Sequence, residues 1–338
     1  MSQKILAVRV GRVGDTVMMT PALTALIEYY PDAEITLLLS PVGRLLLQDY
    51  HPNVKHVWTW NRSGILKPIS DKNQILKKLK TSQFDKIICF DTSPRIGALF
   101  DNVDTEFHQY KGDKVLKHCA KAYLDFLANV CDKPVIDTFN YLPVEQTARD
   151  ETDAELEKHG ISPDDTVLMI HPTFSGYSPY GIRKRQAKLR KLWSPDNYGE
   201  LIKRVIRLTG TNGNNIKAMM VLLPDELSYG EKIVRHSDNN VLLLRSESTF
   251  ERYKSMIQRA DVLLTPDSGP MHMASALGTK IVAFFSMKDP GDCGPYMPPE
   301  KFIILRSENM PNPELGINAI DADTVFDACR NLLTENTN

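Results

Sequence analysis

The sequence predicts an α/β protein made of two doubly wound, Rossmann-like domains with mostly parallel sheets. Its 338 residues exceed what one ordinary core needs and suit two domains of roughly 150 residues each. Strand-length apolar runs alternate with helical patterns, as is typical of parallel sheets. The alternation stops in the irregular, proline-containing stretch Asp132–Gln146 and then restarts. We therefore expect one domain over residues 1–147 and a second over residues 148–338.

In the first domain, the opening strand Lys4–Val10 ends in a glycine-containing turn, and Asp15 is placed to cap a helix that runs to Tyr29. The same reasoning predicts the other elements of this domain. The strands are expected at Glu34–Leu39, Lys55–Trp58 and Lys86–Phe90, and the helices at Val42–Gln48, Gln74–Leu79 and Val115–Val130.

The second domain repeats the alternation of strand and helix. Its strands are expected at Thr166–His171, Lys217–Leu223, Val241–Leu244, Val262–Thr265 and Lys280–Phe285. Its helices are expected at Asp196–Leu208, Tyr229–Arg235, Thr249–Arg259, Met271–Leu277 and Asp323–Leu333. Sheets of this kind bind ligands at the carboxyl ends of their strands, so a cleft between two such domains is the expected active site.

Composition narrows the class of protein. A net charge of −1 gives no general attraction to nucleic acid or to an anionic membrane, so any such contact must be local. The start of the chain lacks the pattern of a signal peptide, and no apolar run is long enough to span a bilayer. The five cysteines form neither a zinc spacing nor a disulfide framework, which indicates a reducing, cytoplasmic setting.

The first motif is the turn from Gly11 to Asp15, which follows the opening strand. Its glycines allow a sharp turn and close approach of a ligand, but the spacing is not that of a dinucleotide fingerprint. Two interpretations of Asp15 are open: the carboxylate caps the following helix, or it takes a proton from an acceptor hydroxyl as a general base.

The second motif, Thr265 to Ala274, lies between a strand and a helix. A helix N-terminus with Ser268 and Gly269 suits a phosphate, whereas the negative Asp267 suits a sugar hydroxyl. The alternatives are that Ser268 or Asp267 caps the helix and that His272 is merely packed.

Two further segments carry groups suited to a nucleotide. Thr173 follows a strand, and Lys191 comes after a basic insertion and two residues before Trp193. The hydroxyl and the ammonium group both suit a diphosphate. The alternative is that the basic insertion is a solvated loop. Leu223-Pro224-Asp225-Glu226 leads to Glu231, and a glutamate at such a strand-to-helix junction commonly holds ribose hydroxyls.

Taken in this order, the four segments resemble the ADP-heptose heptosyltransferases of lipopolysaccharide core assembly, glycosyltransferase family 9. The matching motifs are Gly11 to Asp15 with Pro21-Ala22-Leu23, His171-Pro172-Thr173, Lys191-Leu192-Trp193, and Asp267-Ser268-Gly269-Pro270-Met271-His272 with Ala274, Ala276 and Gly278. The resemblance implies the GT-B fold, with two Rossmann-like domains facing across a cleft. It also implies an acceptor in the first domain, a donor in the second, inversion at the anomeric carbon, and no metal or other cofactor.

The resemblance implies a role for each matching residue. Asp15 would be the catalytic base, and Gly14 and Arg12 would lie at the acceptor. The donor would be held by Thr173 and Lys191 at the diphosphate, Glu231 at the ribose, Asp267 at the heptose, and Ser268, Gly269 and His272 around the phosphates. Glu226 competes with Glu231 for its role. Lys184 and Lys188 compete with Lys191, because the basic insertion is longer than is usual in the family.

The expected partners follow from the same resemblance: an ADP-heptose donor, a lipid-linked or glycan acceptor, and no nucleic acid. A lipid-linked acceptor implies peripheral contact with the inner membrane, for which Lys72–Lys80 and Arg183–Lys191 supply basic side chains. The sole D-x-D sequence, Asp321-Ala322-Asp323, lies near the chain end and suits a helix cap. The alternatives are a GT-B transferase for another nucleotide sugar and a non-catalytic protein that binds a sugar nucleotide.

Overall fold

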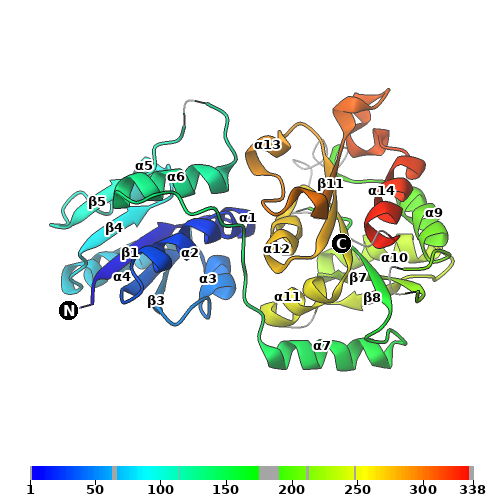
Figure 1. Cartoon of the computed structure of the whole chain (residues 1–338), viewed down its shortest axis with the longest axis horizontal. Helices are drawn as coiled ribbons and strands as arrows, with labels where there is room; N and C mark the ends of the chain where they lie inside the picture. Colours follow the sequence, from blue (N-terminus) through cyan, green and yellow to red (C-terminus); the bar gives the residue numbers. More distant parts are fainter. Residues whose placement is uncertain are drawn as a thin grey trace. The chain divides into compact units, whose positions relative to one another are not determined.

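The computed structural model describes residues 2–62, 67–113, 115–174, 190–210, 213–246 and 249–334. The chain divides into two compact units, Met1–Pro143 and Val144–Asn338, each with its own sheet (Figure 1). The predicted boundary between residues 147 and 148 falls inside helix α7 (Gln146–Lys158), which belongs to the second unit.

The first unit contains a five-stranded parallel sheet in the order β3-β2-β1-β4-β5. The chain forms β1, β2 and β3 outward on one side and then returns to the other side of β1 for β4 and β5. The strand order therefore reverses between β1 and β4, and ligands of open α/β sheets bind at such a switch point. The strands are β1 (Lys4–Arg9), β2 (Glu34–Leu39), β3 (Val54–Thr59), β4 (Lys86–Cys89) and β5 (Glu106–Gln109).

Helices cover both faces of this sheet. Leu6 and Val8 of β1 belong to the same core cluster as Leu79 of α4, while Ile5 and Ala7, on the opposite face, are also fully buried. Helices α2 and α6 pack side by side (Figure 1). The helices are α1 (Val13–Val17), α2 (Thr20–Tyr29), α3 (Pro41–Leu47), α4 (Lys67–Thr81), α5 (Pro94–Gly97) and α6 (Cys119–Cys131).

Three expectations for this unit were wrong in detail. The single helix expected to run to Tyr29 is two helices, α1 and α2, and the N-cap of α1 is Arg12 rather than Asp15. Helix α6 begins at Cys119 rather than Val115, because His118 Nδ1 accepts the N–H of Ala120 and caps the helix there. Strand β5 was not predicted, because it is half exposed and lacks a continuous apolar run.

The second unit contains a six-stranded sheet in the order β11-β10-β9-β6-β7-β8, and its strands are parallel. The chain forms β6, β7 and β8 on one side and then returns to the other side of β6 for β9, β10 and β11. The switch point of this unit therefore lies between β6 and β9. The strands are β6 (Thr166–Ile170), β7 (Ile216–Leu222), β8 (Leu242–Arg245), β9 (Val262–Pro266), β10 (Lys280–Phe285) and β11 (Phe302–Arg306).

The core of the second unit is built around Trp193, which is fully buried and contacts the rings of Tyr198 and Phe284. Helices α9, α10 and α14 contribute to this core, and α11 packs against α7 and α12. Besides α7, the helices are α9 (Pro195–Val205), α10 (Leu227–His236), α11 (Phe250–Arg259), α12 (Gly269–Leu277), α13 (Pro290–Cys293) and α14 (Ala322–Thr334), with short 3₁₀ turns that include Pro224–Glu226.

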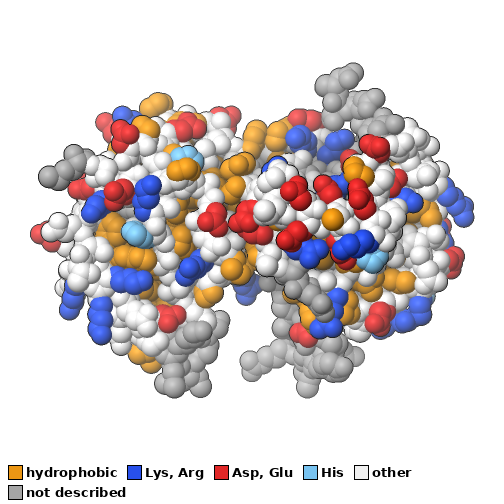
Figure 2. Space-filling model, turned by 90° about the horizontal axis from the view of Figure 1, so that it is seen from below, with side chains coloured by type: hydrophobic (Ala, Val, Ile, Leu, Met, Phe, Trp, Pro, Cys, Tyr) orange, Lys and Arg blue, Asp and Glu red, His pale blue; other side chains and the backbone are white. Residues whose placement is uncertain are grey.

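Three further features concern the cysteines, the surface charge and the apolarity of the helices. No disulfide joins the five cysteines, and Cys89, Cys131, Cys293 and Cys329 are buried. Acidic and basic side chains are interspersed on the face shown in Figure 2. Among the residues that the structure describes, no helix is both long and apolar enough to cross a membrane.

Candidate functional site

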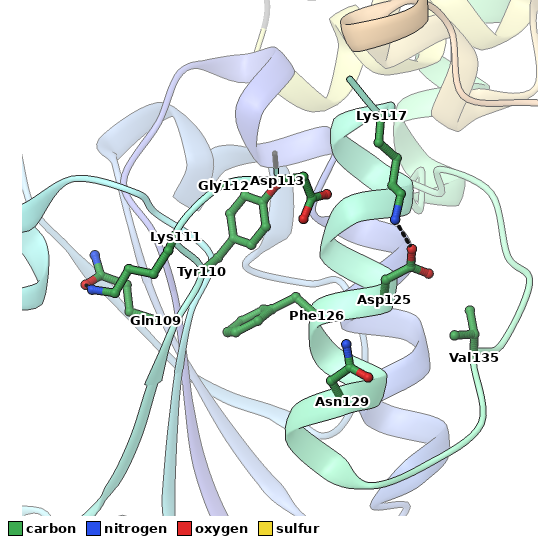
Figure 3. Close-up of a pocket in the computed structure, with 10 residues that line it drawn as sticks. All are labelled: Gln109, Tyr110, Lys111, Gly112, Asp113, Lys117, Asp125, Phe126, Asn129 and Val135. Carbon is green, nitrogen blue, oxygen red and sulfur yellow. Dashed lines mark hydrogen bonds and ion pairs between the residues drawn. The ribbon is translucent and has the colours of Figure 1, made fainter. Parts of the chain in front are cut away.

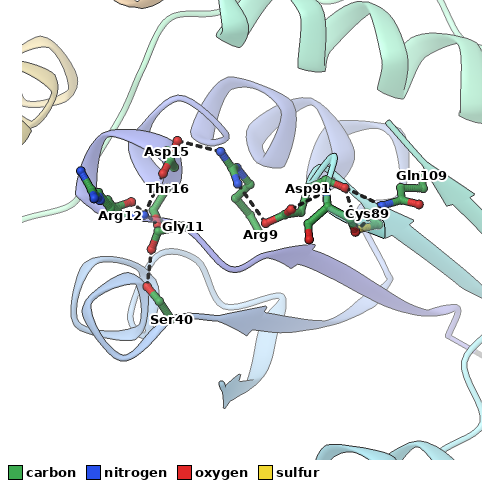
Figure 4. Close-up of polar contacts among 10 residues, drawn as sticks. Arg9, Gly11, Arg12, Asp15, Thr16, Ser40, Cys89, Asp91 and Gln109 are labelled. Atoms are coloured by element: carbon green, nitrogen blue, oxygen red, sulfur yellow. Dashed lines mark hydrogen bonds and ion pairs between the residues drawn. The ribbon is translucent and has the colours of Figure 1, made fainter. Parts of the chain in front are cut away.

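At the switch point of the first unit, one arginine joins two carboxylates (Figure 4). Arg9, the last residue of β1, donates from Nη2 to Asp15 Oδ1 at 2.7 Å and from Nη1 to Asp91 Oδ2 at 3.0 Å. Asp91 lies two residues after the end of β4, and its side chain is only 6% exposed, whereas that of Asp15 is 35% exposed. The arrangement leaves Asp15 as the accessible carboxylate of the pair.

Asp15 is also fixed by its own turn. Its Oδ2 accepts the backbone N–H of Arg12 at 2.8 Å, so the carboxylate does cap α1, from the third helical position. A Cβ on Gly11 would lie 2.4 Å from Asp15 Cβ, so only glycine lets the aspartate fold back this closely. Gly14 lies within α1, and the Arg12 side chain is exposed. Capping and an exposed carboxylate thus coexist in one residue.

A hollow of about 530 Å³ adjoins this cluster, between the end of β5 and α6 (Figure 3). Gln109 links the two features, because it lines the hollow and donates to the carbonyl oxygen of Asp91 at 2.8 Å. The space is within the size range of small-molecule sites. It is lined by Gln109, Tyr110, Lys111, Gly112, Asp113, Lys117, Asp125, Phe126, Asn129 and Val135.

At the switch point of the second unit, Lys191 and Asp267 form an ion pair. Lys191 Nζ lies 2.9 Å from Asp267 Oδ2 and 3.4 Å from the carbonyl oxygen of the same residue. The side chains are 27% and 12% exposed, so the pair remains accessible. Asp267 directly follows β9, and its N–H bonds to Phe284 of the neighbouring strand, so the backbone position of the carboxylate is fixed by the sheet.

The position of Lys191 depends on the buried Trp193 two residues later. Trp193 Nε1 donates to the carbonyl oxygen of Ile320 at 2.7 Å, and the Trp193 carbonyl oxygen accepts from the hydroxyl of Tyr229. With its ring packed and both polar groups bonded, the tryptophan anchors the chain. The Lys-x-Trp spacing therefore brings the lysine to the end of β9.

The N-terminus of α12 begins directly after Asp267. Ser268 is the N-cap and Gly269 the first helical residue, so the first amides of a nine-residue helix lie beside the Lys191–Asp267 pair. Ser268 Oγ lies 2.9 Å from Thr265 Oγ1, which makes the serine part of a buried hydroxyl pair. His272 is buried on the first turn of the helix, at 5% exposure. A helix N-terminus and an ammonium group together suit a phosphate.

Thr173 and Glu226 meet in a buried contact beside the switch point. Thr173 is fully buried, and its Oγ1 donates to Glu226 Oε1 at 2.5 Å. Glu226 Oε2 accepts the N–H of Leu223 at 2.9 Å, which fixes the carboxylate at the end of β7. Glu231, which the resemblance implies for the ribose, lies on the exposed side of α10.

Comparison with known proteins covers both units. The sequence profile of glycosyltransferase family 9 (heptosyltransferase) matches residues 79–318. The chain belongs to glycosyltransferase family 9. It is 22% identical over 312 residues to the lipopolysaccharide core heptosyltransferase OpsX of Haemophilus influenzae, covering 89% of this chain and 84% of the relative.

Two solved structures share the fold of this family 9 protein. A family 9 glycosyltransferase from Veillonella parvula superposes with a TM-score of 0.81 at 18% identity, over 98% of this chain and 97% of that one. The Escherichia coli ADP-heptose lipopolysaccharide heptosyltransferase II superposes with a TM-score of 0.73 at 18% identity, over 98% of both chains. The predicted GT-B fold class is thereby confirmed.

Some expectations for the family 9 site lie outside the described residues, among them Lys184, Lys188 and most of the basic insertion. Sequence reasoning missed Arg9, Asp91 and Tyr253, a residue of α11 whose hydroxyl lies 3.2 Å from His171 Nδ1. The first two carried a signal, because each is a charged residue at the carboxyl end of a buried strand. Tyr253 carried none, because a tyrosine in an amphipathic helix ordinarily packs into the core.

Proposed function

We propose that this protein transfers heptose from ADP-heptose to a sugar of the lipopolysaccharide inner core or a related glycan, with inversion at the anomeric carbon. The observation that carries the proposal is the Lys191–Asp267 pair beside the first amides of α12. A cation, a carboxylate and a helix N-terminus at one switch point suit the phosphates and sugar hydroxyls of a nucleotide sugar. The choice of heptose, ADP and lipopolysaccharide in this proposal is based on the names of the family 9 relatives.

In this proposal the diphosphate binds Lys191 and the amides at Ser268 and Gly269. The phosphate oxygens then replace Asp267 as the partner of the lysine, which leaves the Asp267 carboxylate to accept from heptose hydroxyls. His272 lies beside the phosphates on the same helix turn. Glu226 is a better candidate than Glu231 for the ribose, because it is fixed at the end of β7.

Asp15 is proposed as the base. Its carboxylate takes the proton of the acceptor hydroxyl as that oxygen bonds to the anomeric carbon and the bond from that carbon to the diphosphate breaks. Arg9 and the Arg12 N–H hold the carboxylate in place, and Gly14 and Arg12 lie where the acceptor is proposed to bind.

The test is a mass-spectrometric transfer assay with ADP-heptose and inner-core acceptors. Asp15→Asn should lower kcat at least about 100-fold, because general-base catalysis contributes at least that factor, while the affinity for ADP stays near that of the wild type. Asp101→Asn, at an exposed aspartate of the same unit, is the control and should change neither quantity. An Asp15→Asn variant with near-normal kcat would refute the role of Asp15 as the base. Faster turnover of another nucleotide sugar than of ADP-heptose would refute the assignment of the donor.

We also propose that transfer needs no metal, because Lys191 and the α12 N-terminus supply the positive charge at the leaving diphosphate. Among the described residues, no group of three or more His, Cys, Asp or Glu side chains could hold a metal ion. Asp321 of the D-x-D sequence caps α14 by accepting the N–H of Thr324 at 2.7 Å. Full activity in excess EDTA is expected; loss of activity that Mg²⁺ or Mn²⁺ restores would overturn this point.

For a lipid-linked acceptor, we propose that the enzyme works in the cytoplasm at the inner membrane surface. The lysines of α4 support this placement, because Lys72, Lys77, Lys78 and Lys80 are exposed while the apolar face of the helix is buried. Basic residues near an anionic surface contribute about 1 kcal/mol each. Sedimentation with anionic vesicles, weakened when these lysines become glutamine, tests the contact.

A further inference from the structure

Four polar side chains form a connected chain inside the second unit. Tyr253 of α11 lies with its hydroxyl 3.2 Å from His171 Nδ1, and His171 Nε2 lies 3.3 Å from Thr173 Oγ1. Thr173 Oγ1 in turn lies 2.5 Å from Glu226 Oε1. His171 and Glu226 are each 7% exposed and Thr173 is fully buried, whereas Tyr253 is partly buried, so the chain runs inward from Tyr253.

The chain has one consistent direction. As a carboxylate, Glu226 only accepts, so the Thr173 hydroxyl must donate to it. Thr173 then accepts from His171, which places the proton on Nε2 and leaves Nδ1 to accept from the Tyr253 hydroxyl. Burial lowers the pKa of His171 and raises the pKa of Tyr253, so both groups stay in the neutral forms that this direction requires.

The chain ends on a carboxylate whose two oxygens are already held. Oε1 accepts from Thr173 and Oε2 accepts from the N–H of Leu223, so Glu226 has little freedom to rotate. A carboxylate fixed before a ligand arrives loses less entropy when it binds neighbouring hydroxyls. Buried polar groups also cost free energy unless each one is bonded, and the chain meets this condition from Tyr253 to Glu226.

We infer that Tyr253 and His171 are positioning residues that act through Thr173 to hold Glu226 in the orientation in which it accepts the two ribose hydroxyls of the donor. This inference rests on the proposed function, because it takes the donor to be a nucleotide with an intact ribose. Neither residue touches the donor itself. Their effect reaches the ribose through hydrogen bonds that link α11 and the loops after β6 and β7.

The direction of the chain is tested by ¹⁵N NMR of the histidine rings in the full-length protein, with His171 assigned by its loss in His171→Gln. The expected spectrum is that of a neutral ring with its proton on Nε2. A ring with its proton on Nδ1, or a doubly protonated ring, at neutral pH would overturn the chain.

The effect on the ribose is tested by calorimetric titration with ADP and with 2′,3′-dideoxy-ADP, which lacks both hydroxyls. Tyr253→Phe removes one hydrogen bond and should weaken ADP binding about five- to tenfold, while the affinity for the dideoxy nucleotide stays unchanged. Equal weakening for both nucleotides would mean a general structural role and would overturn the inference.

The matched control is Tyr198→Phe in the same unit. The Tyr198 hydroxyl is buried and has no hydrogen-bond partner among the described residues, so its removal should alter neither affinity.

A second pair of variants tests the same inference in case Tyr253→Phe misfolds. His171→Gln keeps a donor for Thr173 and should retain more ADP affinity than His171→Phe; the reverse order would count against the chain.

Failure of the proposed function has a different signature. Wild-type protein that binds neither nucleotide would overturn the donor assignment and with it the ribose role of the chain. Wild-type protein that binds both nucleotides equally would leave the donor assignment in place and overturn the Glu226 contact alone.

Discussion

Arg9 stands at the end of a buried strand and serves two carboxylates at once. Its guanidinium bonds to the accessible Asp15 and to the buried Asp91. The orientation of Asp15 therefore depends, through Arg9, on Asp91, which comes after β4. Burying a charge is unfavourable unless it is paired, and the shared arginine provides the pairing for Asp91. The orientation of Asp15 is thereby set by the sheet as well as by the α1 turn.

We expect the free energy of unfolding to depend on pH through His171. Burial holds its pKa below the ordinary value of 6.5, so below pH 6.5 the unfolded chain binds a proton that the folded chain does not. Stability is therefore full above pH 6.5 and falls as the pH drops toward the lower, folded pKa. One proton bound only by the unfolded chain lowers the free energy of unfolding by at most about 1.4 kcal/mol per pH unit.

Urea unfolding at several pH values measures this effect. His171→Gln cannot titrate in this range, so its stability should fall less steeply than that of the wild type below pH 6.5. Identical slopes for the two proteins would show that His171 does not contribute.

At the scale of single residues, sequence motifs do not predict which side chains contact one another. Lys191 and Asp267 were both assigned to donor binding, but their contact joins residues 76 positions apart and is not encoded in either motif. The same limit applies to Thr173, which was expected at the diphosphate and whose hydroxyl also bonds to Glu226. Which residues a side chain contacts depends on the order of the strands in the sheet, and the motifs alone do not predict that order.

At the scale of elements, α9 and α10 pack closely because Gly199 lacks a side chain. A Cβ at this position would lie 2.5 Å from both the backbone carbon and the carbonyl oxygen of His236. Backbone atoms cannot move aside as a flexible side chain can. Gly199→Ala should therefore destabilise the second unit by about 1–3 kcal/mol, although alanine is the better helix former by about 1 kcal/mol.

Urea unfolding provides the measurement for this pair of helices. Glu200→Ala, at the exposed neighbouring position of α9, should change the unfolding midpoint little. A Gly199→Ala variant as stable as the wild type would contradict the close packing of α9 on α10.

Element prediction was most accurate for the buried strands. The mostly apolar strands β2 and β10 were placed within a residue of their observed bounds, because a strand buried on both faces is rich in apolar residues. Helix α7 was missed because its surface is mostly polar, with only Ala148, Thr152 and Leu156 buried. Strand β11 is only partly buried and was missed for a related reason.

At the scale of the whole molecule, each unit places the charged residues of its candidate site at the point where its strand order reverses. The proposed donor contacts all belong to the second unit, whereas Asp15 belongs to the first. ADP should therefore protect amides around residues 171–173, 190–193, 223–226 and 265–272, and should leave the first unit unchanged. Hydrogen exchange with mass spectrometry on the full chain measures this directly.

UDP and NAD serve as the comparison ligands in that experiment. At 100 times its Kd, a bound nucleotide stabilises the unit that holds it by about 2.7 kcal/mol, enough for clear protection. Protection by ADP confined to the first unit would contradict the assignment of the donor to the second.

The burial of four cysteines has a practical consequence. Burial raises the pKa of the Cys89 and Cys329 thiols to about 12 and that of Cys293 to about 11, and it also raises the pKa of Cys131. Thiolate is the reactive form, so at neutral pH these sulfurs react slowly with maleimides and with oxidants. Once the half-buried Cys119 is replaced by serine, a cysteine introduced on an exposed helix of either unit becomes the preferred attachment point for a fluorophore. The natural interior can thus stay intact while single-molecule distances report on the enzyme at work.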